Sequence, residues 1–154
     1  PEWIDFPREG NLWSYKYARR QWSLADDPKL KYSFMLDFDR EMINMAREYS
    51  LFSHEFASQI NMDPTNKTII FKRTDLIFVF NFHPHNSIGD YAFSLPDAGV
   101  YRLILSTDDA KYGGFGRNDD SIPYPAVYDP QTKTAVMIIY NTNRTAQVFR
   151  KENP

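Results

Sequence analysis

The stretch DLIFVFNF, residues 75–82, decides the fold of this chain. In an extended strand its apolar side chains occupy both faces, with Phe78 and Phe80 on one face and Ile77 and Val79 on the other. A strand that is apolar on both faces lies inside a sheet that is covered on both sides. The stretch therefore predicts a central β-strand.

Further short runs rich in β-branched and aromatic residues lie on both sides of this strand, at a spacing of roughly 10 residues. These runs are KTIIFKR (67–73), DYAFSL (90–95), VYRLILS (100–106), TAVMIIY (134–140) and RTAQVFR (144–150). Pro, Gly, Asn and Asp residues, which favour turns, separate most of them. Short strands at this spacing are typical of an antiparallel sandwich or barrel, and we expect a mainly β fold of the antiparallel β-sandwich type.

The first third of the chain has a helical pattern instead. Ser14 is expected to cap a helix that runs to Leu24. Asp26 or Asp27 is expected to cap a second helix, with Pro28 at its first position. Apolar residues recur every three or four positions along this second helix and form one stripe, which predicts that the helix lies on another element. The stripe consists of Leu30, Phe34, Phe38, Met42, Met45 and Tyr49.

The change from helical to strand periodicity falls between Ser50 and Ala57. We therefore divide the chain into a helical part, residues 1–55, and an all-β domain, residues 56–154. A chain of 154 residues can bury a sizeable core without disulfides or metals.

Composition excludes some classes of function. A net charge of −2 and a pI near 5.9 argue against a dedicated nucleic-acid binder. No apolar run reaches the roughly 18 residues of a membrane-spanning helix, so no membrane partner is expected. The chain has no cysteine, which fits a reducing compartment and a cytoplasmic location. Aromatic residues make up 16%, which is typical either of aromatic β cores or of rings that bind ligands.

No pattern of residues predicts a catalytic or metal site. The HPH sequence at 83–85 falls in a turn, and zinc needs three or four ligands. Acid pairs at 108–109 and 119–120 flank a Gly-rich loop, where adjacent acids are usually solvated or hydrogen-bonded to their own turns. We therefore expect a non-catalytic module with no metal.

The loop between the acid pairs carries the residues best suited to binding a ligand. Tyr112, Phe115 and Arg117 lie there on a Gly-rich backbone. Aromatic rings and a planar cation suit stacking on sugars or on another protein surface. The alternative is an ordinary loop that packs its own aromatic residues, and the residues alone leave both open.

Five strings carry a resemblance to a known family. They are PEWIDFPREGN (1–11), YKYARRQWSL (15–24), FDREM (38–42), FKRTDLIFVFNFHPHNSIGDY (71–91) and STDDAKYGGFGR (106–117). Together they resemble the C-terminal portion of 1,4-α-glucan (glycogen or starch) branching enzymes, which are amylase-like glycoside hydrolases. The resemblance covers nearly the whole chain in the family's order. It implies a (β/α)8 barrel that carries the chemistry, followed by the all-β amylase C-terminal domain.

By this resemblance, residues 1–55 hold two helices from the end of the barrel, and residues 56–154 are the C-terminal β domain. The family's three catalytic acids lie on barrel strands that would precede Pro1. The resemblance therefore implies a fragment without catalytic residues, inactive alone, from an enzyme that forms α-1,6 branches by transglycosylation. It implies no metal or organic cofactor.

The partners that the resemblance implies are an α-glucan, bound through the parent enzyme, and the catalytic barrel itself. Trp3, Asp5, Arg8, Glu9 and Asn11 match the segment nearest the active-site face of the barrel, where they are expected either to contact outer glucan units or to brace the rim. Exposed apolar residues are expected to allow self-association of the fragment. The alternative is a stand-alone carbohydrate- or protein-interaction module with the same β fold.

Overall fold

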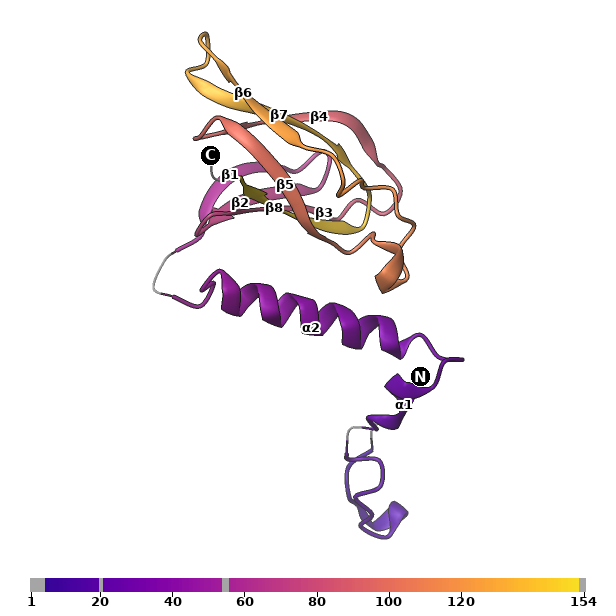
Figure 1. Ribbon diagram of the computed structural model, residues 1–154. Helices are drawn as coiled ribbons and strands as arrows, with labels where there is room; N and C mark the ends of the chain where they lie inside the picture. The colour runs from indigo at the N-terminus through magenta and orange to yellow at the C-terminus, as the bar shows by residue number, and fades with distance from the viewer. Residues whose placement is uncertain (1–4, 20, 54–55, 153–154) are drawn as a thin grey trace.

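A computed structural model describes residues 5–19, 21–53 and 56–152. A β domain lies on one side of the long helix α2, and the N-terminal segment lies on the other side (Figure 1). The helical elements are η1 (Glu9–Asn11), α1 (Ser23–Asp26), α2 (Tyr32–Glu48) and η2 (Ala110–Tyr112). The strands are β1 (Ser58–Asp63), β2 (Thr68–Arg73), β3 (Leu76–Asn81), β4 (Ile88–Leu95), β5 (Gly99–Ser106), β6 (Tyr124–Asp129), β7 (Thr134–Asn141) and β8 (Thr145–Lys151).

The predicted mainly β, antiparallel fold is confirmed. Hydrogen bonds join all eight strands into one sheet, in the order β1-β2-β3-β8-β5-β6-β7-β4, rather than into two separate sheets. Every pairing is antiparallel. The sheet curls on itself, and irregular register in β5 between Leu103 and Leu105 is one place where it bends.

The central strand predicted from DLIFVFNF is also confirmed. β3 lies between β2 and β8, and five of its six residues are buried. Ile77 and Val79 belong to the core inside the curled sheet, together with Phe149. Phe78 belongs to a second core between the sheet and α2. The strand is apolar on both faces because each face of the sheet is covered by a different layer.

The helix predicted from Ser14 to Leu24 is wrong, because among the described residues of this range only Ser23 and Leu24, at the start of α1, are helical. Residues 16–19, inside the predicted helix, form turns and a bend instead. The Ser14 hydroxyl accepts a hydrogen bond from the backbone N–H of Lys16. Such a local bond offers the backbone a turn in place of a helix.

The second helix exists but starts later than predicted. The Asp27 side chain accepts a hydrogen bond from the backbone N–H of Lys29 at 2.9 Å, which closes a turn, and α2 begins only at Tyr32. Of the predicted stripe, Phe38, Met45 and Tyr49 pack on the core under the sheet. Leu30 and Met42 are exposed.

The division into residues 1–55 and 56–154 stays a prediction. α2 ends at Glu48 and β1 begins at Ser58, and residues 54 and 55 lie outside the described residues. No helix in the described ranges is both long enough and apolar enough to span a bilayer.

The two ends of the sheet, β1 and β4, meet without pairing, and hydrogen bonds of the Tyr91 hydroxyl link them. This hydroxyl donates to Asp63 Oδ2 (3.2 Å) and accepts from Asn61 Nδ2 (3.1 Å).

We expect Tyr91→Phe to lower the free energy of unfolding by about 1–2 kcal/mol, because the substitution removes two partly buried hydrogen bonds. Urea denaturation followed by circular dichroism measures the change. The same substitution at exposed Tyr128 is the control, and equal losses in both variants would contradict the role of the Tyr91 hydroxyl.

Candidate functional site

The loop of residues 107–117, which follows β5, is organised around one buried ion pair. Asp108 is only 2% exposed, and its Oδ1 lies 2.7 Å from Nη2 of Arg117. Nε of Arg117 donates to the same carboxylate at 3.1 Å, and the Arg117 backbone N–H donates to Oδ2 at 2.7 Å. The two ends of the loop are therefore fixed to each other.

The electrostatics of this pair keep both groups charged. Burial alone raises the pKa of Asp108, but the hydrogen bonds and the charge of Arg117 outweigh it and hold that pKa below the ordinary value of 3.8. In return, the hydrogen bond to Asp108 raises the pKa of Arg117. At neutral pH the pair is an ion pair, not a neutral hydrogen bond.

Arg117 also links the loop to two distant turns. Its Nη1 donates to Asn143 Oδ1 at 2.9 Å, in the turn between β7 and β8. The Ser87 hydroxyl donates to the same oxygen at 2.9 Å and accepts from the Asn143 backbone N–H at 3.0 Å. Three segments that are far apart in the sequence thus converge at one end of the sheet.

Phe115 is the exposed member of this arrangement. Its ring is 79% exposed, and the guanidinium carbon of Arg117 lies 5.2 Å from the ring centre. A pocket of about 400 Å³ lies here, bounded by Phe115, Arg117, Asn143 and Arg144 among others. A flat ring on a fixed loop, beside amide and guanidinium donors, can stack on a sugar and bond to its hydroxyl groups.

Tyr112 is not part of this pocket. It packs against α2, with its ring edge-on to Phe38 at 5.3 Å and an interplanar angle of 80°. The neighbouring Gly113 has φ 78° and lies against the Phe34 ring, which a side chain at this position would strike. The predicted set Tyr112, Phe115 and Arg117 is therefore divided: Tyr112 is partly buried against α2, and the other two line the pocket.

The predicted N-terminal residues form a turn that is bonded to itself. Asp5 accepts two hydrogen bonds from the Arg8 guanidinium and one from Asn11, all at 3.1 Å. The Arg8 backbone N–H donates to Asn11 Oδ1 at 2.9 Å. Glu9 is exposed beside this turn, and Trp3 lies outside the described residues.

These two groups are not brought together. The N-terminal turn and the loop of residues 107–117 lie on opposite sides of α2 (Figure 1). Whether either group binds a glucan stays a prediction.

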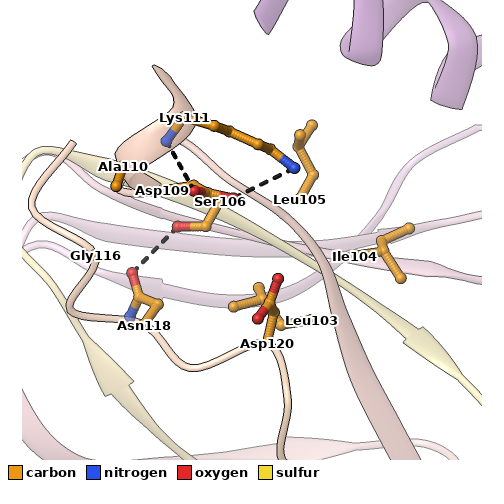
Figure 2. A pocket seen from close by; sticks show the side chains of 10 residues that line it. All are labelled: Leu103, Ile104, Leu105, Ser106, Asp109, Ala110, Lys111, Gly116, Asn118 and Asp120. Carbon is orange, nitrogen blue, oxygen red and sulfur yellow. Dashed lines mark hydrogen bonds and ion pairs between the residues drawn. The ribbon is translucent and has the colours of Figure 1, made fainter. Parts of the chain in front are cut away.

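A smaller pocket is lined by residues of β5 and of the same loop (Figure 2). The Ser106 hydroxyl donates to Asn118 Oδ1 (3.2 Å), and Lys111 Nζ lies 3.3 Å from Asp109. Its volume of about 120 Å³ is below the roughly 300 Å³ at which ligand pockets begin. This pocket is suited to water molecules, not to a sugar unit.

Asp109, Asp119 and His83, which the sequence singled out, form hydrogen bonds within their own turns. Asp109 bonds to Lys111, and Asp119 accepts two hydrogen bonds from Ser121. Nδ1 of His83 accepts backbone hydrogen bonds from the two residues at the end of its own turn, 85 and 86. Within the described part of the chain, no three His, Cys, Asp or Glu residues cluster as metal ligands do.

Sequence reasoning missed the partners of Arg117. Asp108 was visible only as one of two adjacent acids, nine residues before Arg117. Asn143 and Ser87 lie 26 and 30 residues away from Arg117 in the sequence, and no local pattern marks them. Their role depends on the topology of the sheet.

Comparison with protein families gives one match, which covers most of the β domain. The family model of the alpha amylase C-terminal all-beta domain matches residues 60–152.

Individual relatives are similar over more of the chain, and their names agree. A 1,4-alpha-glucan-branching enzyme of Solanum tuberosum is 45% identical over 124 residues, which is 80% of this chain and 14% of that protein. The one of Saccharomyces cerevisiae is 43% identical over 150 residues, 97% of this chain and 21% of that protein. The one of Equus caballus is 36% identical over 155 aligned positions, 100% of this chain and 22% of that protein. The chain thus spans about a seventh to a fifth of the length of these relatives.

Proposed function

Because this chain belongs to the family of alpha amylase C-terminal all-beta domains, we propose that it serves as the C-terminal β domain of a 1,4-alpha-glucan-branching enzyme. One observation supports this most strongly. The identity with branching enzymes extends over 97% to 100% of the chain, so it includes the helical segment that precedes the family match.

In this proposal the chemistry takes place outside this chain. A retaining transglycosylation breaks an α-1,4 bond, holds the released chain as a covalent glycosyl-enzyme, and then transfers that chain to a 6-hydroxyl with release of the enzyme carboxylate. This chemistry needs two carboxyl groups in unlike environments. Asp108, Asp109 and Asp119 accept hydrogen bonds within their own loops, which is a structural role for these acids. The proposed chemistry requires no metal or organic cofactor. We also propose a cytoplasmic location, which the lack of cysteine in this chain supports.

The N-terminal part supplies the surface toward the rest of such an enzyme. Several large apolar side chains before β1 are exposed, among them Leu12, Trp13, Trp22 and Met35. A soluble protein rarely leaves so many together unless another surface covers them. We assign this surface to the catalytic barrel, and α1 and α2 to the end of that barrel. In the isolated chain the same surface would favour self-association.

A chimera tests the proposal. This chain replaces the corresponding segment of the Saccharomyces cerevisiae relative, with which it shares 43% identity. We expect the chimera to branch amylose at a rate within about tenfold of the parent. Replacing the domain with a similar one should change the activation free energy of the catalysed reaction only slightly. Loss of the iodine colour of amylose measures branching.

Two controls accompany the chimera. The relative with its segment deleted is expected to be inactive, and so is the isolated chain. A folded chimera without activity would contradict the proposal and favour a stand-alone interaction module. Branching by the isolated chain would show that the chemistry is not outside it.

A further inference from the structure

We call the line where β1 and β4 meet the seam. The two strands do not pair along it, and side chains bridge it at two points. β1 pairs with β2 instead, and β4 pairs with β7. The Tyr91 hydroxyl bridges the seam at one end. At the other end Lys72 of β2 forms an ion pair with Asp97, which follows β4, at 3.2 Å.

A groove of about 800 Å³ lies at this second end. Both strand edges line it, with Ser58 and Gln59 from β1 and Ser94 from β4. Phe56 and Pro96 supply apolar surface. The volume lies in the range of roughly 300–1,000 Å³ that is usual for ligand sites.

The lining favours a neutral, hydroxyl-rich ligand. Hydroxyl and amide side chains both donate and accept hydrogen bonds, as sugar hydroxyl groups do. Two charged residues of the described lining are Lys72 and Asp75, and the ion pair with Asp97 already compensates the charge of Lys72, so the lining does not attract an anion. The Phe56 ring is 93% exposed, and its faces are free to stack on a pyranose ring.

An extended peptide fits this groove less well. A peptide that adds to a sheet needs a regular edge with evenly spaced N–H and C=O groups. The register of β1, whose Gln59 lines the groove, is irregular between Gln59 and Asn61. Pro96 ends the β4 edge. Bulges and prolines of this kind prevent edge pairing.

We propose that the seam groove binds a linear α-glucan segment, at a site separate from the pocket beside Phe115. This inference rests on the proposed function, which supplies the substrate class. The groove adds a second contact for the polymer on the β domain, and two contacts on one chain strengthen polymer binding beyond either alone.

Affinity electrophoresis in gels that contain glycogen tests the groove. All variants carry Phe115→Ala, which removes the ring at the other pocket. In this background we expect Phe56→Ala to weaken glycogen binding about tenfold, the usual effect of losing one stacked ring. Phe52→Ala is the matched control, because Phe52 is 85% exposed but does not line the groove, and it should leave binding unchanged. Maltoheptaose added to the gel should release the bound chain.

The outcomes separate this inference from the proposed function. Equal retardation of the Phe56→Ala and Phe52→Ala variants would overturn the groove as a glucan site, as would no retardation of the unmutated chain. Capture of an extended peptide by the groove, without glycogen binding, would overturn it too. In each of these cases an active chimera would still support the proposed function. Thermal unfolding checks that the Phe56→Ala substitution, at an exposed position, leaves the fold intact.

Discussion

Gly114→Ala is expected to lower the free energy of unfolding by about 3 kcal/mol, one of the largest effects of any single substitution in this chain. A Cβ at this position would overlap the backbone carbon and oxygen of Asp108 and lie 2.6 Å from its Cα. Those atoms belong to the backbone and cannot move aside as a flexible side chain would. The loop of residues 107–117 would have to open, and the Asp108–Arg117 pair would separate with it.

Gly89→Ala is the control for this substitution. Gly89 has no atom within 4 Å of an added Cβ, so we expect a change within about 0.5 kcal/mol. Urea denaturation followed by far-ultraviolet circular dichroism is the appropriate measurement, since all three tryptophans lie in the first 22 residues and do not report on the β domain. Similar stability of the two variants would show that the loop does not approach Asp108 so closely.

The sequence was sufficient where one local pattern decides the structure. The stretch of residues 75–82 predicted a central strand because only burial on both faces explains four apolar residues on alternating sides, and β3 is that strand. The resemblance to branching enzymes, predicted from five strings, is confirmed by the family match and by relatives that are 36% to 45% identical. The match establishes the family of the chain, but it does not assign a role to any single residue.

The sequence was insufficient where two structures compete locally or where distant segments meet. Ser14 and Asp27 have side chains that suit both a helix cap and a turn, and in both places the turn formed. Tyr112 and Phe115 are both aromatic residues of one Gly-rich loop, but only Tyr112 packs against Phe38 and is partly buried, while Phe115 is exposed. The contact of Arg117 with Asn143 depends on the pairing order of the strands, which no local pattern contains.

The Asp108–Arg117 pair leads to the second large expected effect. Arg117→Met should lower the free energy of unfolding at pH 7 by about 3–4 kcal/mol, because it leaves a carboxylate that is 2% exposed without its cation. Asp108→Asn in the same chain should restore part of the loss, since a neutral amide is less costly to bury than an unpaired charge. The two single variants and the double variant form a cycle whose coupling free energy measures the pair.

The pH dependence of the loss gives the decisive test. The pKa of Asp108 is below its ordinary value of 3.8 in the folded protein, so the pair contributes stability that is complete above that value and is lost as the pH falls through the lowered pKa. In Arg117→Met the cation is gone, and burial then favours the protonated acid. The difference in stability between the two proteins should therefore be largest near pH 7. It should shrink as the pH falls through the raised pKa of Asp108 in the variant and then through the lowered pKa in the unsubstituted protein. A difference that is constant from pH 7 to pH 3 would mean that Arg117 stabilises the loop by packing and by its bonds to Asn143, not by its charge, and the pocket beside Phe115 would then not depend on the ion pair.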